Sequence, residues 1–446
     1  MTAIASPATQ QPRAIRLPSL PYWGLLSIFC LIPAENAVHL FASFVPPLET
    51  FLTSILDGRQ SIVWLIGVLS AATWLLYVGI GRARLYLPGT VVTCLVVYTT
   101  FAILSLSWAT DQSLGIVSLR SLIAKVLFFV LIINLVRTRA RLDVALTLYY
   151  IATIVAGIFL LFHTTTDITL TRGRLAQNTN PNNLGQLFAM AMLMGPYIVS
   201  LTSSKWRRVV LASGMPVLFV ALVATGSITN IVGLLLSFAV GGVILAFRYR
   251  TKIFLSVAVA FCGIVVVIAF AQTQGFIPAR AYDRIANFGG TFGAISSDGV
   301  AEIGNAGLFD ERAALWEAGI TLAEQSWFIG VGTGQYNISY GRLDQNLVRK
   351  GRDSHSTYIK LISEVGIIGL GTFFILVVVI SRHLWKFNKH LMAVTGIMVL
   401  LTTLIFGITH TNLYDDALWL SMGIGTVIPA ILRSESRANN RPAISI

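Results

Sequence analysis

Residues 391–410 read LMAVTGIMVLLTTLIFGITH and contain no Asp, Glu, Lys or Arg. A helix of about 20 mostly apolar residues crosses the hydrocarbon core of a bilayer. Other stretches of the chain have a similar character, and the first is the weakest of them because Pro33, Glu35 and Asn36 interrupt it. We therefore predict an all-α polytopic membrane protein with about 12 transmembrane helices, near residues 22–44, 61–80, 88–107, 117–136, 144–163, 183–202, 208–224, 229–247, 253–271, 355–381, 391–410 and 413–432.

The composition of the whole chain agrees with this class. Hydrophobic residues make up 55% of the 446 residues and charged residues 11%, whereas soluble domains contain about 25% charged residues. The three cysteines, Cys30, Cys94 and Cys262, all lie within apolar runs. Neither a disulfide framework nor a cysteine zinc site is therefore indicated.

The net charge of +13 reflects topology. Basic residues gather in alternate loops and at both ends of the chain, and cytoplasmic loops of membrane proteins carry such an excess. This predicts a cytoplasmic tail over 1–21, nine helices over 22–271, an external loop over 272–354, three helices over 355–432 and a cytoplasmic tail over 433–446. The external loop is close to neutral, so nucleic acid is not an expected partner.

The external loop contains six arginines: Arg280, Arg284, Arg312, Arg342, Arg349 and Arg352. Within it, 310–325 has the spacing of an amphipathic helix, with Ala313, Leu315, Trp316, Ile320 and Ala323 on its apolar side. Arg312 lies at the edge of that side. It is either a cation directed into a membrane-facing pocket or an arginine whose stem covers apolar surface. The glycine-rich 330–334 lacks the context of a nucleotide-binding loop and is predicted to be a turn.

His355 lies at the mouth of the next apolar stretch. With Asp353 or Ser354 as N-cap, we expect His355 in the first helical turn, where the helix dipole and nearby arginines favour the neutral imidazole that a general base requires. In a continuous helix it shares a face with Tyr358, Ile362, Gly366 and Gly369, and the glycines allow a second helix to approach. An interfacial histidine that caps a loop is the simpler alternative.

Several segments together resemble the O-antigen ligase and polymerase superfamily. They are RAALW at 312–316, GVGTGQY at 330–336 and HSTYIKLISEVGIIG at 355–369, with RGR at 172–174, NPN at 180–182 and SWATD at 107–111. Two positions differ from the family pattern: Ser356 replaces an asparagine that often follows the histidine, and Ser227-Ile228 replaces a Ser-Arg pair.

The resemblance implies a GT-C-like glycosyltransferase of the bacterial inner membrane. Such an enzyme moves a glycan from undecaprenyl diphosphate to an acceptor hydroxyl, of lipid A-core or of another glycan, on the periplasmic face. It implies no metal and no cofactor. His355 corresponds to the essential histidine and Arg312 to an arginine of the long loop. We expect further substrate contacts from Arg172, Arg174, Arg280, Arg284 and Tyr358.

Four alternatives stay open. Asp415-Asp416, with Asp111 as a third ligand, is a candidate Mg²⁺ site, although the pair also suits a helix N-terminus. Within the enzyme class, a ligase and a polymerase of lipid-linked repeat units differ only in the acceptor, and we favour the ligase. Outside it, a flippase of lipid-linked oligosaccharide would require charges along a midplane path, and a non-catalytic assembly partner would require no catalytic base.

Overall fold

The computed structural model describes residues 20–42, 61–166, 180–249, 307–343 and 353–439. This part of the chain contains thirteen α-helices and one 3-10 turn at Ser105–Ser107. The α-helices are α1 (Leu20–Ala42), α3 (Ser61–Gly79), α4 (Gly89–Leu104), α5 (Gln112–Leu135), α6 (Arg139–Thr166), α7 (Pro181–Ser200), α8 (Lys205–Ala224), α9 (Ile228–Tyr249), α13 (Gly307–Gln325), α14 (Tyr336–Leu343), α15 (Thr357–Trp385), α16 (Leu391–Thr409) and α17 (Asp416–Asn439).

The predicted polytopic class is confirmed. Eight of the described helices are long and apolar enough to cross a membrane, and α1 and α3 contain shorter apolar stretches. Eleven of the predicted stretches coincide with described helices, whereas 253–271 lies outside the described residues. The total of twelve spans therefore stays a prediction.

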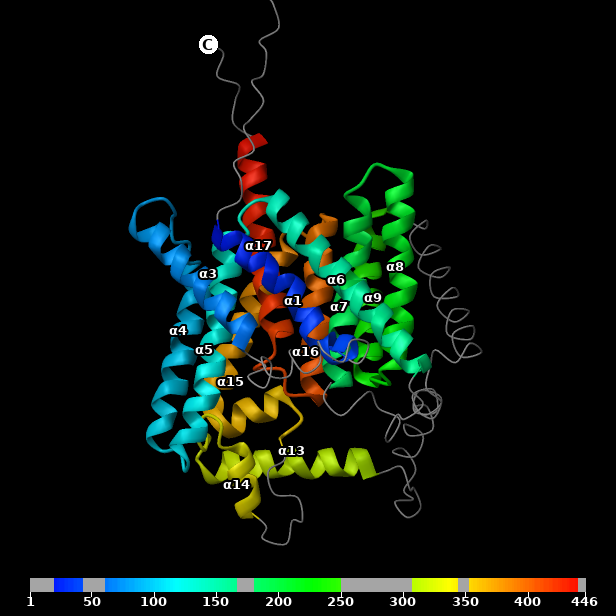
Figure 1. Ribbon diagram of the computed structural model, residues 1–446. Helices are drawn as coiled ribbons and strands as arrows, with labels where there is room; N and C mark the ends of the chain where they lie inside the picture. The colour runs from blue at the N-terminus through cyan, green and yellow to red at the C-terminus, as the bar shows by residue number, and fades with distance from the viewer. Residues whose placement is uncertain (1–19, 43–60, 167–179, 250–306, 344–352, 440–446) are drawn as a thin grey trace, which may run out of the picture.

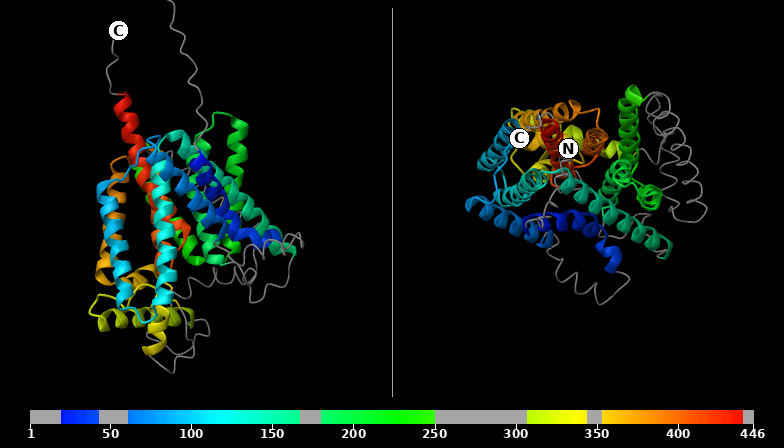
Figure 2. Two further views of the ribbon diagram at one scale, coloured as in Figure 1. Left: turned by 60° about the vertical axis from the view of Figure 1, so that its left-hand side comes forward. Right: turned by 90° about the horizontal axis from the view of Figure 1, so that it is seen from above.

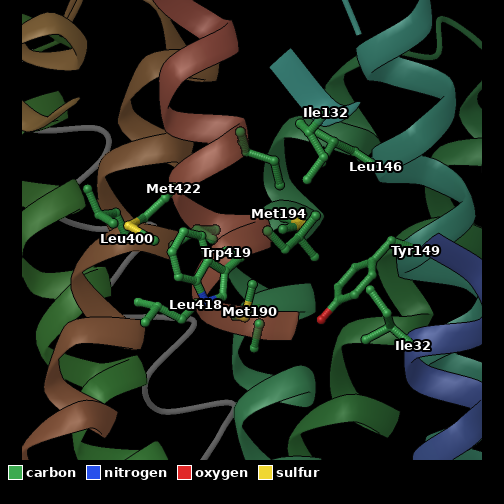
Figure 3. Close-up of a cluster of buried hydrophobic side chains, with 14 of the residues drawn as sticks. Ile32, Ile132, Leu146, Tyr149, Met190, Met194, Leu400, Leu418, Trp419 and Met422 are labelled. Carbon is green, nitrogen blue, oxygen red and sulfur yellow. The ribbon is translucent and has the colours of Figure 1, made fainter. Parts of the chain in front are cut away.

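The long helices form one bundle in which α16 and α17 are central (Figure 1). In the apolar stretch of α17, 78% of the residues are buried inside the protein, compared with 28% in that of α9. Large side chains fill the space around α17: the Trp419 ring lies edge-on to Phe129 and near Met190 (Figure 3), and its indole N–H donates to the Leu413 carbonyl over 2.8 Å. The buried indole is thus both packed and hydrogen-bonded, as buried tryptophans usually are.

Helix α13 lies across the lower end of the bundle, and α14 lies beside it (Figures 1 and 2). Following the orientation predicted from the basic loops, the end of the bundle with α13 and α14 is called the outer end below, and the opposite end is called the cytoplasmic end. The predicted helix over 310–325 is confirmed, but its buried side differs from the predicted one. Leu315, Gly319, Leu322 and Ala323 are buried, whereas the Ile320 side chain is 46% exposed. The prediction is wrong for Ile320 and for Ala313, which is also exposed, because apolar residues occur on exposed surfaces as well as in the core.

Candidate active site

His355 lies in a short loop, 353–356, directly before α15. The predicted position in the first helical turn is wrong, because the N-cap is Ser356, whose hydroxyl accepts the Ile359 N–H. His355 therefore precedes the cap. Its φ of +48° lies in the left-handed region. That conformation costs a non-glycine residue roughly 1–3 kcal/mol and persists only where the surroundings hold it.

Hydroxyl groups fix this loop against the connection between α16 and α17. The Ser354 hydroxyl donates to the Ser356 carbonyl over 2.9 Å and lies 3.3 Å from the Thr411 hydroxyl. Thr357 donates to the Asn412 amide oxygen over 2.6 Å. Because Ser354, Ser356 and Thr357 are buried, these bonds are shielded from water and hold the backbone on both sides of His355.

Helix α15 is broken at Gly366, and its first part, 357–365, is separate from the part that crosses the bundle. Gly366 has φ +64° and ψ −162°, a conformation available essentially to glycine. The predicted face from His355 through Tyr358 to Gly366 and Gly369 assumed a continuous helix, and that prediction is wrong. The glycine admits another backbone, since a Cβ there would lie 2.1 Å from the Phe328 carbonyl oxygen.

The segment that approaches Gly366 is the turn over 326–336. Its amides donate to carbonyls near the break: Val331 to Ser363 over 2.8 Å and Gly332 to Glu364 over 2.9 Å. The Ile367 amide returns a bond of 2.9 Å to the Phe328 carbonyl. The predicted turn at 330–334 is confirmed, and its glycines serve backbone-to-backbone contact with α15.

This turn is also joined to the end of α4 and the start of α5. The Gln335 side chain exchanges two hydrogen bonds with the Asp111 backbone, at 2.7 and 2.8 Å, and the Thr333 hydroxyl lies 2.9 Å from that of Ser105. The Asp111 carboxylate caps α5 by accepting the Ser113 hydroxyl and the Ser113 and Leu114 amides, and these bonds lower its pKa. The residues at 107–111 thus support the turn.

Arg312 is half-buried on the side of α13 that faces the bundle. It shares that side with Leu315, Trp316 and Gly319, and Gly319 packs so closely on Ile359 that a Cβ there would lie 2.3 Å from it. Helix α13 therefore crosses the first turn of α15, next to the loop of His355. Arg312 is two helical turns before this crossing, roughly 10 Å along the axis.

Tyr358 has a different environment from the one predicted. Its hydroxyl donates to the Leu404 carbonyl over 2.7 Å, and its ring stacks on Phe374 with 5.6 Å between centroids. Both the polar and the apolar part of the side chain are therefore used within the bundle. This geometry argues against the predicted substrate contact.

The sequence reasoning missed a buried group of charges beside His355. The Lys360 ammonium lies 2.8 Å from Asp353 Oδ1, 3.9 Å from Glu364 Oε1 and 5.4 Å from the centre of the Tyr414 ring. Burial alone would raise the pKa of Asp353, but the Lys360 charge and the bonds from Thr411 and Ser354 outweigh it and lower that pKa. Glu364 Oε2 accepts the Gly334 amide over 2.9 Å, and Oε1 accepts the Tyr336 amide over 3.2 Å.

A signal for this group was present in the sequence. Charged residues at 353, 360 and 364 stand at the start of an apolar stretch, where charges are costly and usually paired.

Asp415 and Asp416 take separate roles. Asp416 begins α17, as the helix-start alternative predicted, and binds Lys125 over 2.7 Å. Burial raises the pKa of Asp415 to about 7. The proposed third ligand, Asp111, caps α5 instead. Within the described ranges, His, Cys, Asp and Glu side chains form no group of three that could hold a metal ion.

Four of the predicted substrate-binding residues lie outside the described residues: Arg172, Arg174, Arg280 and Arg284. Asn180 caps α7, and the Asn182 carbonyl accepts the Asn230 side-chain amide over 2.7 Å. The start of α7 is therefore fixed to the first turn of α9.

Residues 213–374 match the family model described as Wzy_C: O-Antigen ligase. The chain carries an O-antigen ligase family domain. The match runs from α8 into α15 and includes Arg312, His355 and Glu364. The protein is thus a membrane enzyme of the O-antigen ligase and polymerase type. A comparison with curated proteins gave no match.

Proposed function

We propose that this O-antigen ligase family enzyme transfers a glycan from undecaprenyl diphosphate to an acceptor hydroxyl at the outer face of a bacterial inner membrane. One observation carries the proposal. His355 is held in a left-handed backbone conformation at the outer end of the bundle, beside the crossing of α13, and both lie in the matched segment. Strained residues held by their surroundings gather at active sites.

The reaction needs a base and cations. The acceptor oxygen attacks the anomeric carbon, the bond from that carbon to the diphosphate oxygen breaks, and the hydroxyl proton passes to His355. The departing undecaprenyl diphosphate carries the electron pair, and arginines stabilise its charge by two-point contacts with phosphate oxygens. We assign Arg312 to this role, together with Arg172 or Arg174 and Arg280 or Arg284.

The family includes two acceptor classes, and of the two reactions we favour that of the ligase. A ligase joins the glycan to lipid A-core, whereas a polymerase joins it to a second lipid-linked repeat unit. The test is to incubate the purified protein in lipid nanodiscs with undecaprenyl-diphosphate glycan and each acceptor separately. Mass spectrometry of the products would assign the acceptor, and no diphosphate release with either acceptor would contradict the enzyme assignment.

The arginine assignment has its own test. Lysine is a point charge and cannot make the two-point contact, so the Arg312→Lys enzyme should lose about tenfold or more in kcat/KM. Arg139→Lys at the cytoplasmic end is the matched control and should be unchanged. Full activity of the Arg312→Lys enzyme would remove the two-point contact from the proposal.

A further inference from the structure

The left-handed conformation of His355 raises the question of what holds this loop in place. Its hydroxyl bonds fix it to the connection between α16 and α17, but the charges connect it to α15 and to the turn. The carboxylate of Asp353, two residues before His355, lies 2.8 Å from the Lys360 ammonium. Lys360 is five residues after His355, in the first part of α15, before the kink.

The same ammonium is shared with a second segment. Glu364 accepts the amides of Gly334 and Tyr336, and is 1% exposed. The turn that contains these amides leads to α13, because the Tyr336 hydroxyl donates to the Leu315 carbonyl over 2.6 Å. A chain of contacts therefore runs from the histidine loop through Asp353, Lys360 and Glu364 to the helix that contains Arg312.

Lys360 supplies the counter-charge for a group of acidic side chains. Two carboxylates, on Asp353 and Glu364, face one ammonium, and Asp415 lies close enough to affect it. Removing the ammonium would leave buried carboxylates without a counter-charge, and such carboxylates move toward water or take up a proton. Either response would release the loop of His355 or the turn from α15.

We propose that Lys360 is a positioning residue that joins the loop of His355 to the turn over 326–336, which follows α13. Lys360 thereby holds the base, His355, in a fixed position relative to Arg312. This inference rests on the proposed function, because it takes His355 as the base. Lys360 contacts the histidine loop directly through Asp353 and reaches the turn through Glu364. Both oxygens of Glu364 accept backbone amides of the turn, Oε2 from Gly334 and Oε1 from Tyr336.

The test uses the full-length enzyme with Lys360→Met, Lys360→Arg and Lys360→Met combined with Asp353→Asn. Lys360→Met keeps the length of the stem and removes the charge. We expect kcat to fall at least tenfold with less than a twofold change in KM for the donor, and Lys360→Arg to recover part of the rate. A kcat unchanged in Lys360→Met would overturn the proposal.

The pH profile separates positioning from stability. Charged or titratable groups on the loop and on elements packed around it include Asp353, Lys360, Glu364, His410, Tyr414, Asp415 and Arg312, together with Tyr336, Asp416 and Lys125. Without Lys360, the Asp353 carboxylate near His355 favours imidazolium. The acid limb of the kcat–pH profile should therefore move to higher pH. Adding Asp353→Asn should return the limb without restoring kcat. A limb that does not move would count against the proposal.

Lys125→Met is the matched control, because it removes a different ion pair of the outer end, with Asp416 at 2.7 Å. It should lower thermal stability and leave the acid limb in place. Should Lys360→Met not fold, Asp353→Asn alone keeps the shape of the side chain and tests the same link through kcat.

Hydrogen exchange gives a readout that does not depend on activity. In Lys360→Met, amides of 330–336 and 353–357 should exchange faster together, and exchange confined to one segment would overturn the coupling. If His355→Ala stays active while these amides respond together, the proposed function fails and the coupling stands. If His355 is essential and Lys360→Met is normal, the positioning proposal alone fails.

Discussion

The two ends of the bundle use charge in different ways. At the cytoplasmic end, Arg139 and Glu435 are 3.6 Å apart with side chains 50% and 38% exposed, and Arg141 lies over the Tyr22 ring. At the outer end, the ion pair of Lys360 and Glu364 is far more buried, with side chains 11% and 1% exposed. From the sequence, we expect the number of basic residues at the cytoplasmic end to set the orientation of the chain. The buried charges of Lys360 and Glu364 instead each face a particular partner.

The physical reason is the cost of removing charge from water. Exposed ion pairs contribute about 0–1 kcal/mol because solvent screens them. Breaking a buried pair leaves a charge without compensation and costs about 3–5 kcal/mol. The same substitution should therefore have different consequences at the two ends.

The largest difference is expected for the histidines. His355→Ala should lower kcat by about 10²–10⁴, the usual contribution of a general base, with expression and donor binding retained. His390→Ala changes an exposed histidine at the cytoplasmic end and should leave the rate unchanged. Single-turnover assays on purified variants measure both. Near-normal turnover of His355→Ala would show that His355 is not the general base.

The next difference concerns stability. Glu364→Ala should lower the free energy of unfolding by about 3–5 kcal/mol, because it leaves the buried Gly334 and Tyr336 amides without their acceptor and removes one of the two carboxylates that face Lys360. Glu435→Ala, at the cytoplasmic end, should cost no more than about 1 kcal/mol. Thermal unfolding in the same detergent compares them. Equal losses would mean that burial does not distinguish the two ends.

The fold followed from the sequence more completely than the site did. Apolar stretches such as 391–410 identify spans by length and composition alone, and the described α16 begins at Leu391. The break at Gly366 was not predictable, because transmembrane helices tolerate glycine and the backbone that enters the gap comes from Phe328, far upstream. From the sequence alone, Gly366 is predicted to be a glycine that lets a second helix pack closely.

The same limit applies to the site residues. His355 and Arg312 were found because their residue types suit the chemistry. Lys360 and Glu364, four residues apart, resemble an ordinary pair on a helix surface. Their burial depends on contacts with 330–336 and with Tyr414, which sequence spacing does not reveal.

A smaller effect is expected in the pH dependence of stability. Because burial raises the pKa of Asp415 to about 7, the folded protein binds more protons than the unfolded chain between the ordinary carboxyl range and that value. This group's contribution therefore falls as pH rises across the window and levels off above it. Asp415→Asn should show a smaller decrease in Tm between about pH 5 and 8 than the unsubstituted protein.

Asp353 is the control for that measurement. Its pKa is lowered, so its contribution to stability is present above the ordinary carboxyl pKa and is lost only as pH falls through the lowered value. Asp353→Asn should therefore reduce Tm by a similar amount throughout the same window. An undiminished pH slope in Asp415→Asn would show that this carboxyl does not titrate there.

The smallest effect is expected from removal of divalent ions. The Asp416 carboxylate is bound to the Lys125 ammonium and the Asp111 carboxylate to amides of α5, so both of these candidate ligands already have partners. If arginines stabilise the leaving diphosphate, EDTA should not change the rate. Asp416→Asn should reduce Tm with little change in kcat, since the lost interaction is the pair with Lys125. Activity that EDTA abolishes and Mg²⁺ restores, with Asp416→Asn as damaging as His355→Ala, would transfer the chemistry from the arginines to a metal. That result would also make the outer carboxylates, rather than the cations, the decisive charges at this end of the bundle.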